Sequence, residues 1–145
     1  MLLKNGENKL NINKFIEKEE INKTKNVSNI EITINSKKVY KNYEIYSITI
    51  KNNTSNTIKI ADENNSKDIC LLDKNNVEYA SFLEEISISD LSLRAGESKN
   101  VNIKFNKIYD LYRVIEKIKF NNIDLGLQEY TDEASNERIN VTIEI

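Results

Sequence analysis

Two stretches of alternating apolar and polar residues constrain this chain more than any other feature of its sequence. Residues 46–53 read YSITIKNN, and residues 91–105 read LSLRAGESKNVNIKF. Alternation with a period of two residues buries one face of a strand and leaves the other face in water. Two antiparallel sheets packed face to face meet this requirement for every strand. The alternation therefore predicts an all-β protein built as an antiparallel β-sandwich.

Length, charge and composition bound the domain and its partners. A chain of 145 residues is one domain by size, and it is long enough to bury a core without disulfide bonds or structural metals. The net charge is −2, and the lysines are dispersed among acids, so no basic surface for nucleic acid is expected. No apolar run approaches the roughly 20 residues of a membrane span, and we expect no membrane insertion by this chain. The abundance of Asn, Lys and Ile, with no Pro, Trp or His, is typical of a low-GC bacterium.

Turn residues divide the segment from residue 29 to residue 145 into about eight to ten short strands, which is the spacing of a sandwich. Residues 73–76 predict the turn of a hairpin, and residues 131–136 predict a second hairpin near the end of the chain. One or two helical turns are expected near residues 108–115, where apolar residues fall at helical spacing. Besides a short extended piece near 39–40, the expected strands are 29–34, 44–51, 57–61, 68–72, 77–80, 91–93, 100–105, 116–120, 123–127 and 138–145.

Residues 1–28 differ from the rest of the chain, because they are polar and carry little β-branched pattern. We interpret residues 1–28 as a polar lead-in or stalk, and residues 29–145 as the sandwich domain. Asn13 is placed to cap a short helix that runs through Glu20. A frayed segment and a docked helix both remain open. Removal of residues 1–25 is expected to leave cooperative melting nearly unchanged.

Three patterns of turn and strand residues resemble a known family. They are ITIKNN at 48–53, LDKNNVEY at 72–79, and LRAGES at 93–98 followed by VNIKF at 101–105. Together they resemble the bacterial immunoglobulin-like domains of unknown function found on secreted, lipid-anchored or membrane-anchored Gram-positive proteins. That fold is similar to the fold of a secreted mycobacterial immunogenic protein. The resemblance covers residues 29–123, and it implies an immunoglobulin-like β-sandwich in an extracellular or cell-surface protein, without catalytic residues to carry over.

The residue types exclude several kinds of catalysis. Nucleophilic catalysis by Ser or Cys with a His base is excluded because the chain has no His. One Cys and no His cannot build a zinc site. The single cysteine, Cys70, precedes Leu71 and Leu72 in an expected buried strand, and we predict a packed, unreactive thiol. We expect no catalytic, cofactor-binding or metal-binding residues.

Oxygen ligands leave one metal hypothesis open. Five side chains fall at the spacing of positions 1, 3, 5, 7 and 12 of a calcium loop. Lys67 stands where that loop needs Gly, and strands rather than helices are expected on both sides. A solvated loop is therefore favoured over a calcium site. The five residues are Asp62, Asn64, Ser66, Asp68 and Asp73.

Acidic pairs and tyrosines are the remaining candidates. The pairs Glu84-Glu85 and Asp132-Glu133 offer two carboxylates, but no aromatic platform for sugar rings surrounds them. We expect Tyr46 and Tyr79 to lie in core strands. Four other tyrosines remain candidates for surface recognition, with core or edge packing as the alternative. They are Tyr40, Tyr43, Tyr109 and Tyr112.

The leading functional hypothesis is a non-catalytic binding or structural module at the bacterial cell envelope, with a protein or cell-wall polymer as its ligand. The chain shows no apolar export segment. This favours the alternative, an intracellular interaction or assembly protein that uses an exposed edge strand. A carboxylate- or calcium-dependent enzyme is the third hypothesis. An unchanged melting temperature on adding calcium and then chelator would remove its calcium version.

Overall fold

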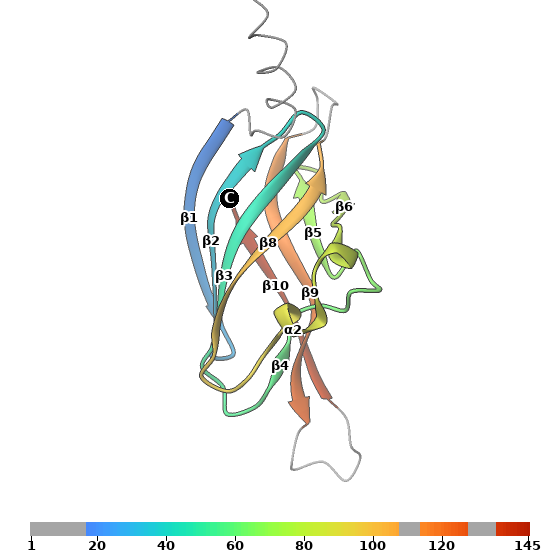
Figure 1. Ribbon diagram of the computed structural model, residues 1–145. Helices are drawn as coiled ribbons and strands as arrows, with labels where there is room; N and C mark the ends of the chain where they lie inside the picture. Colours follow the sequence, from blue (N-terminus) through green and yellow to red (C-terminus); the bar gives the residue numbers. More distant parts are fainter. Residues whose placement is uncertain (1–16, 108–113, 128–135) are drawn as a thin grey trace, which may run out of the picture.

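Antiparallel strands make up most of the structure, a computed structural model that describes residues 17–107, 114–127 and 136–145. Two sheets pack face to face (Figure 1), which confirms the predicted all-β sandwich. The first sheet has the order β1-β2-β3-β8. The second has the order β6-β5-β9-β4-β7, with β10 paired to β9. The elements are β1 (Glu17–Val27), β2 (Ile30–Val39), β3 (Tyr43–Asn52), β4 (Ile58–Lys59), β5 (Ile69–Asp73), β6 (Glu78–Ala80), a 3-10 turn (Leu83–Glu85), α2 (Ile88–Leu91), β7 (Ser92–Leu93), β8 (Ser98–Asn106), β9 (Ile115–Leu127) and β10 (Asn136–Glu144).

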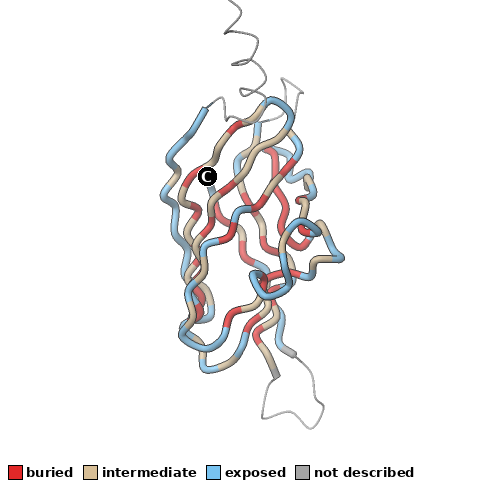
Figure 2. The backbone as a smooth tube through the Cα atoms, viewed as in Figure 1, coloured by how far each residue is buried: buried red, intermediate tan, exposed pale blue. Residues whose placement is uncertain are grey.

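The core follows the alternation of the sequence. Figure 2 shows buried positions alternating with more exposed ones along β2, β3 and β8. Ile48 of β3 pairs with Ile34 of β2 and with Val101 of β8, so three apolar side chains lie side by side on one inner face. Phe120 and Ile118 of β9 belong to the same buried cluster from the opposite sheet. The strands β2, β3, β5, β6 and β8 were predicted, although β2 is one strand over the two pieces expected at 29–34 and near 39–40. The predicted period of two is confirmed in β2, β3 and β8, whereas every residue of β5 is buried. The hairpin across residues 73–76 is confirmed.

The segment 91–105 does not form a hairpin, although two strands flank its turn. Leu91 ends the short helix α2, and β7 pairs with β4 in the second sheet. β8 pairs with β3 in the first sheet. The turn at residues 94–97 therefore carries the chain from one sheet to the other, with Gly96 at a φ of +78° that favours glycine.

The prediction that residues 1–28 form a polar lead-in outside the sandwich is wrong from residue 17 onward. Residues 17–27 form β1, which pairs antiparallel with β2 along its length. Ser28 and Asn29, where the domain was expected to begin, form the two-residue turn of this hairpin, with φ values of 52° and 63°. The helix expected through Glu20 is a strand over residues 17–20, and residues 1–16 lie outside the described part. Because Ile21 packs against the core, removal of residues 1–25 would take away part of the sandwich.

The two strands expected at 116–120 and 123–127 are one strand, β9. Asn122 has a φ of 74°, and its backbone N–H donates to Oδ1 of Asn140 on β10 at 2.8 Å. Asn adopts this left-handed conformation more readily than most residues, so the ladder to β10 shifts register here instead of ending. The helical turns expected near 108–115 and the hairpin turn at 131–136 fall mostly outside the described residues.

The three sequence patterns at 48–53, 72–79 and 93–105 contain turns whose hydrogen bonds stabilise the fold. Asn52 is fully buried, and its Nδ2 donates to the backbone oxygens of Leu93, Arg94 and Asn56 at 3.1, 3.0 and 2.8 Å. Its own backbone oxygen accepts from Gly96 N–H at 2.8 Å. The pattern at 48–53 thus binds the pattern at 93–98 directly, across about forty residues of sequence.

Asp73 has the same kind of role in the pattern at 72–79. Its Oδ1 accepts from the backbone N–H groups of Asn75 and Val77 at 2.8 and 3.0 Å, and the Tyr79 hydroxyl donates to its Oδ2 at 3.0 Å. These bonds fix the β5–β6 turn. Asn52 and Asp73, which belong to the patterns that carry the resemblance, therefore have a structural role in turns.

Candidate functional site in the edge strands

The edge strand β1 carries charged side chains on the face that its neighbours use for the core. Val27, Lys25 and Lys23 pair with Ile30, Ile32 and Ile34, whose side chains are buried. Directly paired residues share a face of the sheet, so both lysines point to the inner side of β1. They remain exposed because no strand of the described chain pairs with the far edge of β1.

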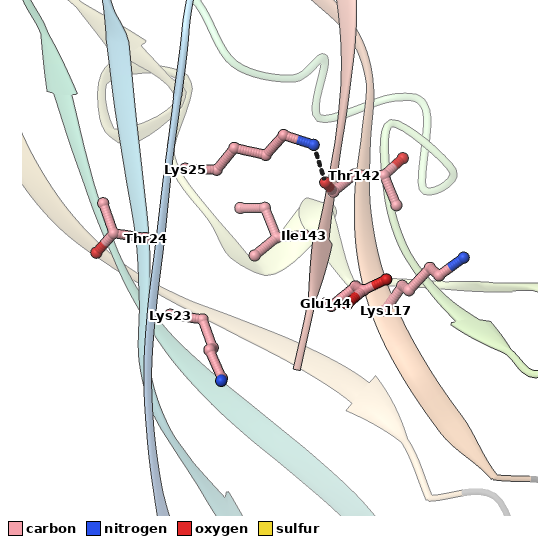
Figure 3. Close-up of a pocket in the computed structure, with 7 residues that line it drawn as sticks. All are labelled: Lys23, Thr24, Lys25, Lys117, Thr142, Ile143 and Glu144. Carbon is pink, nitrogen blue, oxygen red and sulfur yellow. Dashed lines mark hydrogen bonds between the residues drawn. The ribbon is translucent and has the colours of Figure 1, made fainter.

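A groove separates β1 from β10, the edge strand of the opposite sheet (Figure 3). Its volume is about 520 Å³. Lys25 reaches across it, and its Nζ donates to the backbone oxygen of Thr142 at 2.7 Å. The buried side chain of Ile143 lies on the β10 side. The groove is lined by Lys23, Thr24, Lys25, Lys117, Thr142, Ile143 and Glu144.

Charge is distributed unevenly along β1. Its second half presents Lys23 and Lys25 to the groove, while its first half presents Glu17 and Glu19 on the same inner side, opposite Val39 and Lys37. Glu19 forms an ion pair with Lys37 at 3.5 Å. Within the described residues, Lys23 has no ion-pair partner within 4 Å. The inner side of this strand therefore carries acids at one end and bases at the other.

The free edge of β1 also offers backbone groups. In a two-residue hairpin, the pair next to the turn is hydrogen-bonded, and bonded pairs alternate with unbonded ones along the ladder. Val27 and Lys25 therefore bond to β2, and Thr24 directs its N–H and C=O away from the sheet. A register shift between Glu20 and Lys23, with Asn22 at a φ of 51°, interrupts this edge at its middle. The arrangement suits non-covalent contact through charges and backbone hydrogen bonds.

The five residues of the calcium hypothesis do not converge. Asp62 and Asp68 are close, because Oδ2 of Asp68 accepts from the backbone N–H of Asp62 at 2.9 Å. The strand β5 then separates Asp68 from Asp73, which bonds to its own turn. Asn64 and Ser66 lie in the loop between Asp62 and Asp68. The described residues contain no cluster of three acidic, Cys or His side chains placed to hold a metal.

Three of the other candidates, Glu85, Tyr43 and Tyr40, gather around Lys104. Glu84 and Glu85 lie exposed in the 3-10 turn, and Glu85 forms an ion pair with Lys104 at 3.3 Å. Tyr40 and Tyr43 stack on each other with ring centroids 4.6 Å apart, and the Lys104 ammonium lies 4.4 Å from the Tyr43 ring centroid. As expected, Tyr46 is fully buried, while Tyr79 is half-buried and bonds to Asp73. Asp132, Glu133, Tyr109 and Tyr112 lie outside the described residues.

Cys70 is fully buried, as predicted. Its thiol donates to Oε2 of Glu78 at 3.6 Å, and Nδ2 of Asn121 donates to its sulfur at 3.7 Å. Burial, reinforced by the Glu78 carboxylate, raises the pKa of the Cys70 thiol from 9.0 to about 12. The thiolate needed for nucleophilic attack is therefore disfavoured in the folded protein.

Two results follow for Cys70. At pH 8 the native thiol is expected to react with a thiol reagent at least about 100-fold more slowly than in the unfolded chain.

The unfolded chain releases the Cys70 thiol proton above pH 9, and the folded chain keeps it. The contribution of Cys70 to stability that is present below pH 9 is therefore lost as pH rises toward 12. Melting curves between pH 8 and 11 test this, with Cys70→Ala as the variant that should lose less stability. Rapid native labelling would contradict the burial of Cys70.

Sequence reasoning missed β1, and with it this site. The segment contains only two apolar residues, Ile21 and Val27, so hydrophobic alternation gave no signal. The available signal was the Ser28-Asn29 pair, polar residues that suit a tight hairpin turn immediately before a clear strand. The hydrogen bond from Lys25 to the backbone oxygen of Thr142, 117 residues later, could not be predicted from any sequence pattern.

Comparison with known proteins finds similarity of structure alone. No family model and no curated protein matches the chain. A functionally unknown protein from Listeria monocytogenes is similar in structure, with a TM-score of 0.55 and 15% identity over 91% of this chain and 86% of that one. The yjhA protein from Bacillus subtilis gives a TM-score of 0.55 and 15% identity over 87% of this chain and 98% of that one. At such identity the likeness concerns the fold. No helix in the described ranges is long and apolar enough to cross a membrane.

Proposed function

We propose that this chain is a non-catalytic binding module of the bacterial cell envelope that contacts a protein partner along the edge strand β1. The observation that carries the proposal is the ordered charge on the inner side of that exposed strand, with Glu17 and Glu19 at one end and Lys23 and Lys25 at the other. Isolated charges on an edge strand usually deter other strands. An ordered series of both signs favours one complementary partner instead.

Support for the envelope location comes from the turn and strand patterns at 48–53, 72–79 and 93–105, which resemble domains of Gram-positive surface proteins. Support for a binding role comes from the residue types. The chain has no His, and its single thiol is buried and held protonated. Non-covalent contact is the chemistry that the β1 edge and the adjoining groove suit best.

The alternative is an intracellular assembly protein that uses the same edge. It is favoured by the free backbone groups of β1, which can extend a sheet by one strand. Protease treatment of intact cells, beside a cytosolic control protein, separates the two. Selective digestion supports the envelope module, and protection until lysis supports the intracellular one.

Contact along β1 is tested by site-specific photo-crosslinking in intact cells. A photoreactive residue replaces Thr24, whose backbone faces the free edge, and the matched control replaces Asn75 in the exposed β5–β6 turn. We expect a discrete adduct from position 24 and none from position 75. Equal adducts from both positions, or none from position 24, would overturn the proposed contact edge.

A further inference from the structure

We infer that the partner of β1 is β1 of a second copy of this chain, docked antiparallel about a two-fold axis near Ile21. The inference rests on the proposed contact edge and goes further by identifying its partner. A two-fold interface brings the same surface of both copies together, so the surface must complement itself. The charge order of β1 meets this condition.

The complementarity can be followed residue by residue. With Ile21 opposite its own copy, Lys23 lies opposite Glu19 of the other copy, and Lys25 lies opposite Glu17. All four residues lie on the inner side of the strand. On the outer side the same register places Lys18 opposite Thr24, so no like charges meet. Opposite charges at paired positions stabilise an antiparallel ladder, and like charges destabilise it.

The spacing along the strand fits as well. Residues two positions apart on one face of a strand are separated by about 6.7 Å, so both charge pairs form in one register. The register shift at Asn22 lies beside the two-fold axis. The two irregular points therefore lie on either side of the axis, each opposite Glu20 of the other copy, and residues 17–19 of one copy pair with residues 23–25 of the other.

The inward lysines select against other strands. An uncharged strand added to β1 would cover Lys23 and Lys25 without neutralising them, which is unfavourable for buried charge. A second β1 supplies two carboxylates at the matching positions. The acids and bases on the inner side of β1 therefore disfavour the addition of an uncharged strand and permit pairing with a second β1.

The opposite sheet leaves room for this arrangement. The groove and the Lys25–Thr142 bond place β10 beside residues 23–25, in the second half of β1. In the two-fold pair, β10 of the other copy would lie beside the first half of this β1. The two copies of β10 therefore occupy opposite ends of the interface.

Charge exchange tests the pairing directly. One variant carries Lys23→Glu and Lys25→Glu, and the other carries Glu17→Lys and Glu19→Lys. Sedimentation velocity from low micromolar to millimolar concentration measures association, and circular dichroism melts confirm that each variant is folded. A matched control carries Lys67→Glu and Lys74→Glu, at exposed positions on either side of β5 in the other sheet.

We expect concentration-dependent dimers of the wild-type chain and of the control. Each charge variant alone should associate at least about tenfold more weakly, because like charges meet across the interface. An equimolar mixture of the two variants should restore the dimer as a heterodimer. A monomeric wild-type chain at millimolar concentration, or a mixture no tighter than its components, would overturn the inference.

A backbone variant distinguishes strand pairing from charge attraction alone. Thr24→Pro removes an N–H that faces the free edge and keeps all four charges. We expect this variant to be monomeric, and an unchanged dimer would overturn pairing through β1. A position-24 crosslink of a mass other than twice the chain, together with monomeric wild-type protein, would reject self-pairing and retain the proposed binding edge.

Discussion

Replacing Ile48 by Asp is expected to unfold the domain. Ile48 is fully buried in β3, between Ile34 on β2 and Val101 on β8. A carboxylate at this point would lose its hydration without gaining a cationic partner, at a cost of several kcal/mol or more. Because domains of this size have a net stability of about 5–15 kcal/mol, one such charge removes much or all of it. Ile103→Asp, at an equally buried position, is expected to have the same effect.

The measurement is near-ultraviolet circular dichroism with limited proteolysis of the purified variant. Ile48→Val is the matched control, because it removes one methylene group and should destabilise the fold by about 0.5–1.5 kcal/mol. A soluble Ile48→Asp protein with native spectrum and protease resistance would show that this face of β3 is not in the core.

Asn52→Ala is expected to reduce the free energy of unfolding by about 3 kcal/mol or more. The substitution leaves the backbone oxygens of Leu93, Arg94 and Asn56 without their shared donor. It also removes the acceptor of the Thr54 N–H and hydroxyl, which donate to Oδ1 at 3.0 and 2.6 Å. A buried polar group without its partner costs about 1–3 kcal/mol, and several are affected here.

Urea denaturation measures this effect, and a lower midpoint with an unchanged slope would indicate lost native stability. Asn53→Ala is the control. Asn53 is exposed, and its described hydrogen bond runs from its backbone N–H to the oxygen of Asn29, so a change within about 0.5 kcal/mol is expected. Equal effects at the two positions would argue against Asn52 as the connection between the turns.

Local patterns predicted individual strands well and their partners less well. The alternation in β3 and β8 identified both strands, because the face that is buried depends only on residue order. The same reasoning placed residues 91–93 and 100–105 around one turn but did not reveal that they belong to different sheets. Sheet membership depends on contacts such as those of Asn52 with Leu93 and Arg94, which join distant parts of the chain.

An all-β sandwich, the inward face of its central strands and a buried Cys70 could all be predicted from residue order, because they depend on which side chains avoid water. The strand at residues 17–27, and the groove that its lysines face beside β10, became visible only in the folded chain. This difference arises because β1 has few apolar residues of its own. Pairing with β2 and the arrangement of two sheet edges define its position, and those contacts join residues up to 117 positions apart.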